Sequence, residues 1–298
     1  MADARRSLPE NVAGDIFVDD SCIDCDTCRQ IAPATFRDHG GQASVYRQPA
    51  SRRERQLSLK ALVACPTASI GTRAKTPDLS AAVAAYPERI DGDVYFCGFT
   101  SEKTFGGWSY LIARPSERGG NVLVDSPRFT RPLVRRLHGL GGVRVMFLTH
   151  RDDVGDHAAF AREFRCGRVM HAADGAARFE VERVVDGPTA LRLDEELLAI
   201  PTPGHTRGHM VLLHGERFLF TGDHLAWSPE DGALRAFPDV CWYSWAEQTA
   251  SMRRLLDYRF EWVLPGHGRL HHAAAKTMHA QLRDCVEWMT SSRYTPLP

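Results

Sequence analysis

The sequence contains no long apolar run. Nowhere do about 18 apolar residues follow one another, which is roughly the length a helix needs to cross a bilayer. The first residues also lack the apolar stretch of a secretion signal. We therefore expect neither a membrane-spanning protein nor a secreted one, and we predict a cytoplasmic location.

The sequence also lacks an excess of charge of either sign. Lysine plus arginine and aspartate plus glutamate each number 37, so the formal net charge is zero. Only four of the basic residues are lysines, and the arginines are spread along the chain. Nucleic acids and acidic membranes are bound through concentrated basic patches. We therefore predict neither as a partner.

The distribution of residue types predicts two domains of unequal size. Residues 1–75 have few apolar runs and carry four of the eight cysteines, whereas apolar strands begin to alternate with helical stretches from residue 91 onward. Between them, residues 76–90 are rich in alanine with prolines near both ends, which indicates a linker or a short connecting helix. The 298 residues suffice for a large domain with a small one in front.

Within residues 91–298 the pattern is that of an α/β protein whose polar motifs follow strand ends. Loops at strand ends can converge on a ligand while the sheet beneath them stays rigid. The predicted helices are residues 157–164 and 246–258. The predicted strands are residues 94–99, 109–113, 121–124, 143–149, 195–200, 209–213, 218–221 and 262–264.

Four cysteines have the spacing of a metal-cluster site. Cys22, Cys25 and Cys28 lie within seven residues, and Cys65 is followed by a proline, as iron–sulfur ligands often are. This favours a [4Fe–4S] cluster over zinc, which would more naturally pair two Cys-x-x-Cys knuckles, and over four buried thiols. Residues 14–72 resemble the single-cluster bacterial ferredoxins, and the resemblance implies a low-potential one-electron carrier. The other cysteines are predicted to be structural, namely Cys97, Cys166, Cys241 and Cys285.

A second group of motifs places histidine or aspartate at turns, mostly beside glycine. The first is Thr-His-Arg-Asp-Asp-Val-Gly-Asp-His, residues 149–157, which directly follows a predicted strand. The others are Pro-Gly-His-Thr-Arg-Gly-His (203–209), Thr-Gly-Asp-His (221–224) and Pro-Gly-His-Gly (265–268). Trp242, Tyr243 and Trp245 lie between the last two motifs and either line a pocket or belong to the core.

Residues 91–289, with these motifs in this order, resemble the metallo-β-lactamase-fold superfamily, in particular glyoxalase II-like hydrolases and flavodiiron oxygen reductases. The resemblance implies an αββα sandwich with a two-metal centre. It implies that His205 binds one metal, that Asp223 bridges both, and that His267 binds the other. The pair Asp156 and His157 matches the end of the family's first motif, which ligates the second metal.

The first motif departs from the family pattern His-x-His-x-Asp-His. His150 and Asp156 are two residues further apart than in that pattern, and Asp152 occupies the place of the second histidine. A carboxylate there resembles the flavodiiron variant and favours iron or manganese over zinc. Asp153 is an alternative replacement ligand. The predicted metal set, with Asp156 and Asp223 also expected to take part in catalysis, is His150, Asp152, Asp156, His157, His205, Asp223 and His267. His209 is expected to support these ligands by hydrogen bonding.

These sites predict a cytoplasmic oxidoreductase in which a [4Fe–4S] cluster exchanges electrons with two metal ions, preferably iron, acting on a small molecule. A redox partner protein and dimerisation are both possible, and no flavin is expected because no flavodoxin-like segment is visible. One alternative is a zinc- or iron-dependent hydrolase of glyoxalase II or lactonase type, with a structural or regulatory cluster. Another is a non-enzymatic redox carrier or sensor.

Overall fold

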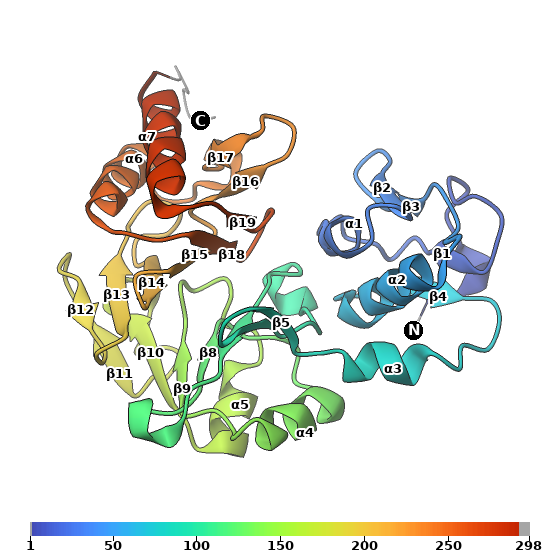
Figure 1. The fold of residues 1–298 in the computed structure, drawn as a ribbon, viewed down its shortest axis with the longest axis horizontal. Coiled ribbons are helices and arrows are strands. Elements are labelled where there is room, and N and C mark those ends of the chain that lie inside the picture. Colours follow the sequence, from blue (N-terminus) through green and yellow to red (C-terminus); the bar gives the residue numbers. More distant parts are fainter. Residues whose placement is uncertain (1, 292–298) are drawn as a thin grey trace.

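A computed structural model describes residues 2–291. It shows a small N-terminal unit beside a larger two-sheet unit (Figure 1). The small unit pairs β1 (Ile16–Val18) with β4 (Ile70–Thr72) and β2 (Phe36–Asp38) with β3 (Ala43–Val45), both antiparallel. Its helices are α1 (Thr27–Ile31) and α2 (Arg52–Ala64). No helix of the described residues is long and apolar enough to pass through a membrane.

Helix α2 begins and ends at local signals in the sequence. The Ser51 side chain accepts a hydrogen bond from the Glu54 amide, and the Glu54 carboxylate accepts one from the Ala50 amide. The helix ends at Cys65, and Pro66 cannot continue it. One face of α2 packs against the small unit through Ala61. The opposite face, with Leu59 and others, belongs to the large core of the two-sheet unit.

The small unit is thus attached to the large one by a continuous hydrophobic core. Polar contacts reinforce the attachment, since Thr100 donates to the Ala64 carbonyl and Arg128 donates to the carbonyls of Val63 and Pro66. Within the predicted linker, residues 76–90, the structure places α3 (Leu79–Ala84) and the first residues of strand β5. The connection is therefore a packed element and not an extended chain.

The large unit contains two sheets. The first has the order β11-β10-β9-β8-β7-β6-β5 and the second β12-β13-β14-β15-β18-β19. The first comprises β5 (Glu88–Asp91), β6 (Val94–Phe96), β7 (Tyr110–Ile112), β8 (Val122–Val124), β9 (Val145–Phe147), β10 (Gly167–His171) and β11 (Arg183–Val185). The second comprises β12 (Leu191–Arg192), β13 (Leu197–Pro201), β14 (Met210–His214), β15 (Phe218–Gly222), β18 (Trp262–Pro265) and β19 (His271–His272).

Helices cover the outer face of each sheet (Figure 1). The first sheet carries α4 (Arg131–Gly139) and α5 (His157–Phe164), and the second carries α6 (Trp245–Arg254) and α7 (Ala275–Ser291). The layers are therefore helix, sheet, sheet, helix, which confirms the αββα sandwich that the resemblance implies. The small unit in front of it combines helices with strands. The remaining elements are the hairpin of β16 (Ala226–Ser228) and β17 (Ala233–Arg235) and short 3-10 turns at 4–6, 102–104, 116–118, 172–174, 238–240 and 255–257.

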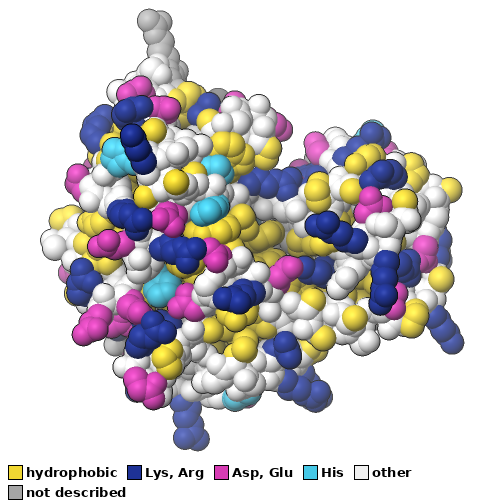
Figure 2. All heavy atoms as spheres, in the orientation of Figure 1, with side chains coloured by type: hydrophobic (Ala, Val, Ile, Leu, Met, Phe, Trp, Pro, Cys, Tyr) yellow, Lys and Arg dark blue, Asp and Glu magenta, His cyan; other side chains and the backbone are white. Residues whose placement is uncertain are grey.

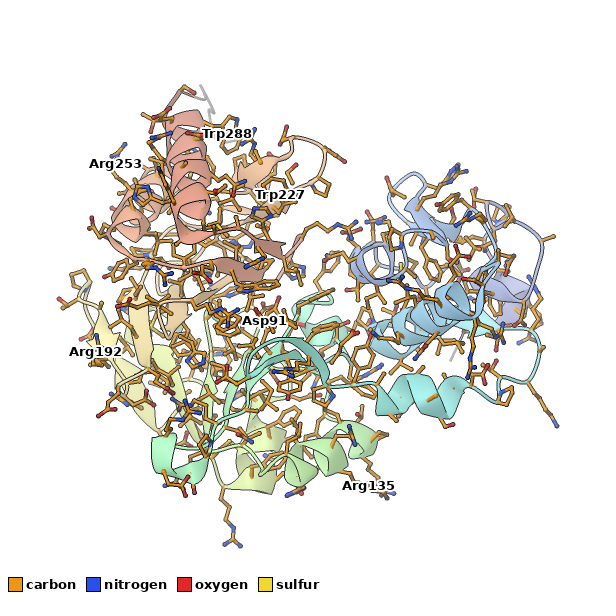
Figure 3. All side chains as sticks on the ribbon, viewed as in Figure 1. Asp91, Arg135, Arg192, Trp227, Arg253 and Trp288 are labelled. Carbon is orange, nitrogen blue, oxygen red and sulfur yellow. The ribbon has the colours of Figure 1, made fainter. Side chains whose placement is uncertain are left out.

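Side chains alternate in direction along the central strands, which explains why two separate cores form. In β15, Phe218 and Phe220 face the core between the sheets, and Leu219 faces the helices. Neighbouring side chains of a strand point to opposite faces, so a strand covered on both sides is apolar throughout. Side chains fill the space on both sides of the second sheet, and Trp227 and Trp288 pack on its helix-covered side (Figure 3).

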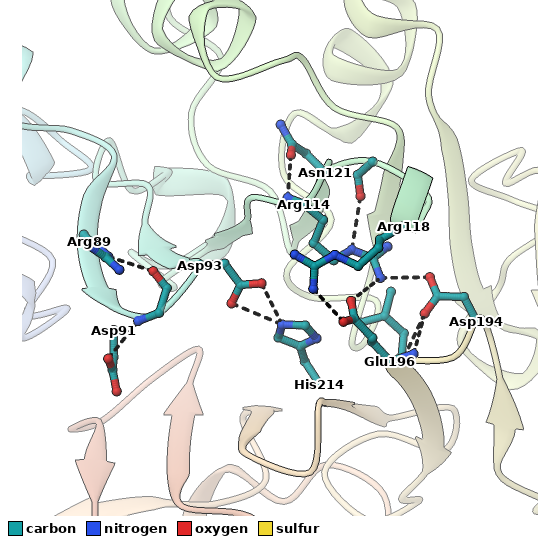
Figure 4. Close-up of polar contacts among 12 residues, drawn as sticks. Arg89, Asp91, Asp93, Arg114, Arg118, Asn121, Asp194, Glu196 and His214 are labelled. Carbon is teal, nitrogen blue, oxygen red and sulfur yellow. Dashed lines mark hydrogen bonds and ion pairs between the residues drawn. The ribbon is translucent and has the colours of Figure 1, made fainter. Parts of the chain in front are cut away.

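Polar pairs join the two sheets along one edge (Figure 4). His214, at the end of β14, lies 3.1 Å from the Asp93 carboxylate, which precedes β6 in the other sheet. The buried Arg114 pairs with Asp194 at 2.9 Å. Burial acts to raise the pKa of Asp93, but the hydrogen bond and charge of His214 outweigh it, so the pKa lies below its usual value.

The Asp93 pair predicts an acid-dependent contribution to stability. A lowered pKa in the folded state means that the stabilisation is present at neutral pH and is lost as the pH falls through that pKa, below 3.8. Replacing the carboxylate by an amide, Asp93→Asn, should lower the free energy of unfolding by about 1 kcal/mol at pH 6. Urea unfolding at several pH values should show this difference shrinking below pH 4. The exposed Asp186→Asn serves as the control, and an equal effect of both variants would contradict the assignment.

Candidate functional site

The four cysteines of the N-terminal motif surround one small void. Cys22 and Cys25 come from the loop after β1, Cys28 from α1, and Cys65 from the end of α2. The amide of Ala43 lies 3.4 Å from the Cys22 sulfur and that of Ser69 lies 3.3 Å from the Cys65 sulfur, so backbone N–H groups point at two of the sulfurs. These residues fit an iron–sulfur cluster, because four converging thiols with N–H donors are the ligand set such clusters use.

Burial disfavours the charged thiolate form of these cysteines when no metal is bound. It raises the pKa of Cys25 to about 11 and raises the pKa of Cys22 and Cys28 as well. A bound metal deprotonates its thiol ligands, so the cost of burial is offset only when the group is bound. Beside the void, Arg29 pairs with Asp26 at 2.5 Å and with Asp24 at 2.6 Å, which fixes the cysteine loop.

The histidine and aspartate motifs converge on two overlapping groups of potential ligands. His150, His205 and Asp223 form one group, and Asp153, Asp223 and His267 form the other. Within each group the ligand atoms all lie within 4.8 Å of one another. Asp223 belongs to both, and its Oδ2 lies 3.7 Å from His150 Nε2, 3.8 Å from His205 Nε2 and 3.9 Å from His267 Nε2.

Strand ends deliver these side chains to one place. His150 follows β9 closely, His205 follows β13, Asp223 directly follows β15, and His267 follows β18. These strands belong to both sheets, so the groups sit at one rim of the sandwich. Short loops after buried strands leave their side chains little freedom, which pre-organises the site.

Several buried atoms at this rim have no hydrogen-bond partner among the described residues 2–291. They are His150 Nε2, His205 Nε2, Asp153 Oδ2 and Asp223 Oδ1. An unpaired buried polar atom is costly, and here four of them face a common space. The residues therefore fit a pair of cations sharing the Asp223 carboxylate.

The ionisation of these groups agrees with cation binding. Burial, and then the charge of Asp223, raises the pKa of Asp153 well above its usual value. Burial lowers the pKa of His150 to about 4, so its ring is neutral and able to ligate. Burial acts to raise the pKa of Asp223, yet the neighbouring histidines, His267 above all, outweigh it, so the pKa lies below its usual value.

Hydrogen bonds behind the ligands hold them in orientation. His150 Nδ1 lies 2.9 Å from the Thr149 hydroxyl, which in turn donates to the buried Asp125 carboxylate. The Asp174 carboxylate accepts from the Thr206 hydroxyl and from the amides of Arg151 and Gly208, and so ties two motif loops together. Such supporting bonds leave the Nε2 atom of His150 free for a metal.

His209 lies beside His150, but among residues 2–291 its side chain makes no hydrogen bond to a predicted ligand. It is fully buried, its Nδ1 is 3.0 Å from the Thr202 hydroxyl, and its ring centre is 5.2 Å from that of His150. The supporting roles of Asp125 and Asp174 were not predicted. Asp125 had a signal in the sequence, because it follows a strand end as the motif residues do. Asp174 had none.

Asp152 lies at the mouth of the first group. Its Oδ2 is 3.6 Å from His205 Nε2, and about half of its side chain is exposed. The neighbouring His205 side chain lowers the pKa of Asp152, so its carboxylate is charged beside the group. Asp152 lies beside the first group of potential ligands but is not a member of either group.

The structure brings neither Asp156 nor His157 into the two groups, which corrects the predicted metal and catalytic roles of these residues. The Asp156 carboxylate accepts from Lys103 at 2.6 Å and from the Phe129 amide at 2.8 Å. His157 is 3.1 Å from Arg168 and packs against Phe179. The two additional residues of the first motif are the reason, because they place Asp153 at the rim and leave Asp156 to begin α5.

A cavity of about 870 Å³ joins the metal groups to the cysteine site. The surface is hollowed between the two units, and hydrophobic side chains gather there (Figure 2). Asp24, Cys25 and Asp26 line the cavity from the small unit. The large unit contributes Lys103, Thr104, Phe105, Arg151, Asp152, Asp153, His205, Asp223, Phe237, Val240, Trp242, His267 and Gly268.

Two consecutive glycines, Gly106 and Gly107, lie in space between Cys25 and Asp153. A methyl group on Gly106 would lie 2.9 Å from the Cys25 sulfur, and one on Gly107 would lie 2.8 Å from Asp153 Oδ1. Adjacent Cα atoms are about 3.8 Å apart, so about 13 Å at most separates the Cys25 sulfur from that oxygen. The Thr27 hydroxyl also donates to the Gly106 carbonyl at 3.3 Å, which holds the two units together here.

Comparisons with known proteins agree with this two-part organisation. Residues 18–72 match the family model of the 4Fe-4S single cluster domain of ferredoxin I, and residues 103–267 match that of the metallo-beta-lactamase superfamily. A hydroxyacylglutathione hydrolase of Mesorhizobium japonicum is 28% identical over 120 residues, which are 39% of this chain. The chain spans about half, 47%, of the length of that curated relative.

Solved structures with a similar fold have low sequence identity. ST1585 from Sulfolobus tokodaii, an archaeal metallo-beta-lactamase superfamily protein, is 19% identical with a TM-score of 0.46, covering 64% of this chain and 83% of that one. ETHE1 from Myxococcus xanthus is 20% identical with a TM-score of 0.46, covering 67% and 92%. TTHA1623 in a di-iron-bound form is 23% identical with a TM-score of 0.44, covering 56% and 89%.

The position of Asp153 predicts which carboxylate holds the second metal. The shape-preserving variant Asp153→Asn should lower the metal bound outside the cluster from about two ions per chain to about one, because it removes a charged ligand. The matched variant Asp156→Asn should leave both ions in place. Elemental analysis with sulfide determination measures this. Metal loss in Asp156→Asn but not in Asp153→Asn would restore the assignment predicted from the sequence.

The void between the cysteines predicts a selective effect of cysteine replacement. Cys25→Ser should reduce acid-labile sulfide well below the roughly four per chain of a complete cluster, since one corner loses its thiolate. Cys166→Ser, a buried cysteine outside the motif, should retain full sulfide. Sulfide assays and absorbance spectra of protein purified without oxygen report the result. Equal sulfide in both variants would rule out Cys25 as a ligand.

Proposed function

The chain belongs to the metallo-beta-lactamase superfamily, with a 4Fe-4S domain ahead of that fold, and from this premise we propose that it is an iron-dependent oxidoreductase acting on a small molecule. In this proposal Cys22, Cys25, Cys28 and Cys65 hold the cluster. A dinuclear centre, preferably diiron, is held by His150, Asp152, Asp153, His205, Asp223 and His267. When bound, such metals polarise a substrate and, if they are iron, exchange single electrons with it.

The shared cavity is the observation that carries this proposal. Cys25 and the metal-group residues Asp153 and His267 line the same hollow. Hydrolysis needs no electrons, so a hydrolytic site has no need of a cluster ligand at its wall. The bound of about 13 Å between the Cys25 sulfur and Asp153 is also short enough for electron tunnelling within a protein.

The protein's own residues account for the other requirements of the site. Asp152, Asp153 and Asp223 add hard oxygen ligands to the imidazoles, which favours iron or manganese over zinc. Lys103 neutralises Asp156 at the edge of the cavity, so this carboxylate does not compete for the metals. Apolar side chains, including Phe237 and Val240, limit water in the cavity and strengthen electrostatic interactions there.

Hydrolysis is the second candidate function. It is supported by the match to a hydroxyacylglutathione hydrolase and by the shared superfamily. A centre holding zinc would activate water, and the cluster would then be structural or regulatory. The distinguishing property is turnover of an ester or thioester without any reductant.

Metal and sulfide analysis combined with Mössbauer spectroscopy tests the proposal directly. Protein purified without oxygen should contain about six irons and four sulfides per chain, with the additional iron distinct from cluster iron. Four irons, four sulfides and one or two zinc ions would overturn the proposal in favour of the hydrolase. Fewer than two metals outside the cluster would favour a redox carrier or sensor.

Gly106 provides a test of electron exchange between the two sites. Alanine there would place its methyl 2.6 Å from Cys25 Cβ at a φ of +84°, so Gly106→Ala should push the units apart without removing a ligand. We expect reduction of the non-cluster iron after mixing with dithionite to slow by at least about tenfold, as small misplacements at active sites do. Rapid-freeze Mössbauer spectra measure this rate.

The control for this test is Gly41→Ala. Gly41 has the same φ of +84°, but no atom of the described part of the chain lies within 4 Å of the added methyl, so it reproduces the backbone strain without the clash. Both variants should retain full iron and sulfide. Equal reduction rates in Gly106→Ala and Gly41→Ala would show that the Cys25 contact plays no part in electron exchange.

A further inference from the structure

Two aromatic side chains in the cavity are unusually exposed. Among residues 2–291, Trp242 is 61% exposed and Phe105 is 55% exposed, and these are the highest values among the large apolar residues. Both line the 870 Å³ cavity together with Phe237 and Val240. Exposed apolar side chains that gather at a cavity mark a ligand-binding surface, whereas singly scattered ones are normal.

Each ring stands beside one of the two metal groups. The Trp242 amide donates to the His205 carbonyl at 3.0 Å, and the Trp242 ring centre lies 6.3 Å from that of His205. Phe105 follows Thr104, whose carbonyl is 3.2 Å from His267 Nε2, and its ring centre lies 6.3 Å from that of His267. The backbone therefore ties each ring to a histidine of a different group, and both groups share Asp223.

The backbone of Phe105 is strained. Its φ is +50°, in the left-handed region that a bulky residue rarely adopts and that glycine adopts freely. Such strain is concentrated at functional sites. A residue that is both strained and exposed contributes little to the stability of the fold. The Phe105 ring is therefore free to contact a molecule that enters the cavity.

We propose that Phe105 and Trp242 form an aromatic clamp for the planar, aromatic or conjugated body of the substrate. The clamp places the reacting group of that molecule over the shared Asp223 carboxylate. This inference rests on the small-molecule site of the proposed function and adds the class of substrate. Aromatic rings recognise planar π-systems by stacked or edge-to-face contact, beyond the burial of area.

The cavity argues for a small molecule and not for a partner protein. Its volume lies within the range of small-molecule sites, roughly 300–1,000 Å³. A stable protein interface buries over about 1,000 Å² of surface. Here the two rings line a hollow that also contains the metal groups, so the occupant must enter it.

Binding of a redox-inert probe tests the clamp. Isothermal titration of the metal-loaded protein without oxygen would compare 2-acetylnaphthalene with its fully saturated decalin counterpart. We expect the planar probe to bind more tightly, and Trp242→Ala and Phe105→Gly each to weaken it by about fivefold, the scale of aromatic contacts. Tyr243→Ala is the matched control, since Tyr243 is 48% exposed and adjacent but is not among the lining residues.

Thermal unfolding of Phe105→Gly separates binding from structure. Glycine relieves the strain, so this variant should be at least as stable as the natural protein while binding the planar probe less well. A marked loss of stability would assign Phe105 a structural role and overturn the proposal. Equal affinity of both probes, or equal affinity of the clamp variants and Tyr243→Ala, would also overturn it.

The outcome is independent of electron transfer. The probe binds without turnover, so selective binding together with zinc in the metal groups would remove the oxidoreductase proposal and leave the clamp. Two irons outside the cluster, without selective binding of the planar probe, would leave the oxidoreductase proposal and remove the clamp. A planar probe bound with the same affinity by every variant would place it outside the cavity and reject the clamp.

Discussion

The Asp223 carboxylate is the interaction on which the rest of the site depends. One of its oxygens lies within 4 Å of three imidazole nitrogens, which come from loops after three different strands. Without a cation, His150, His205 and the buried Asp153 would share this space with too few hydrogen bonds. The sandwich withstands that cost because each of these side chains lies within a few residues of the end of a buried strand. The rigid strand ends thus hold the unpaired ligand atoms together despite the energetic cost, and a bound metal ion would offset that cost.

The segment 101–108 extends this arrangement to the small unit. Its Thr104 carbonyl contacts His267, its Gly107 packs on Asp153, and its Gly106 packs on Cys25. The same segment carries Phe105 into the cavity. Because one short stretch of backbone contacts both sites, a shift of the small unit would be felt at the metal groups. The packing of α2 against the core of the large unit keeps such shifts small.

Support behind the ligands is as important as the ligands themselves. The bonds from Thr149 to Asp125 and from Thr206 to Asp174 satisfy buried carboxylates and fix the loops that carry His150 and His205. Burial raises the pKa of Asp125, and the hydrogen bonds from Thr149 act against that rise, so Thr149 connects this carboxyl to His150. The site is therefore a network in which orientation and charge are set together.

The sequence by itself determined the local features of this protein. Cysteine spacing, strand patterns and glycine-flanked motifs are properties of neighbouring residues. They predicted an α/β domain, a cluster site and the motif residues His150, His205, Asp223 and His267, which the structure brings together. The αββα sandwich was implied by the family resemblance that these motifs carry. The tertiary structure alone decided that Asp153, and not Asp156 or His157, completes the second group. It also decided that Cys25 and Phe105 share a cavity with the metal groups. Those outcomes depend on how a lengthened loop folds back and how two units pack, and long-range packing leaves no mark in the spacing of a motif.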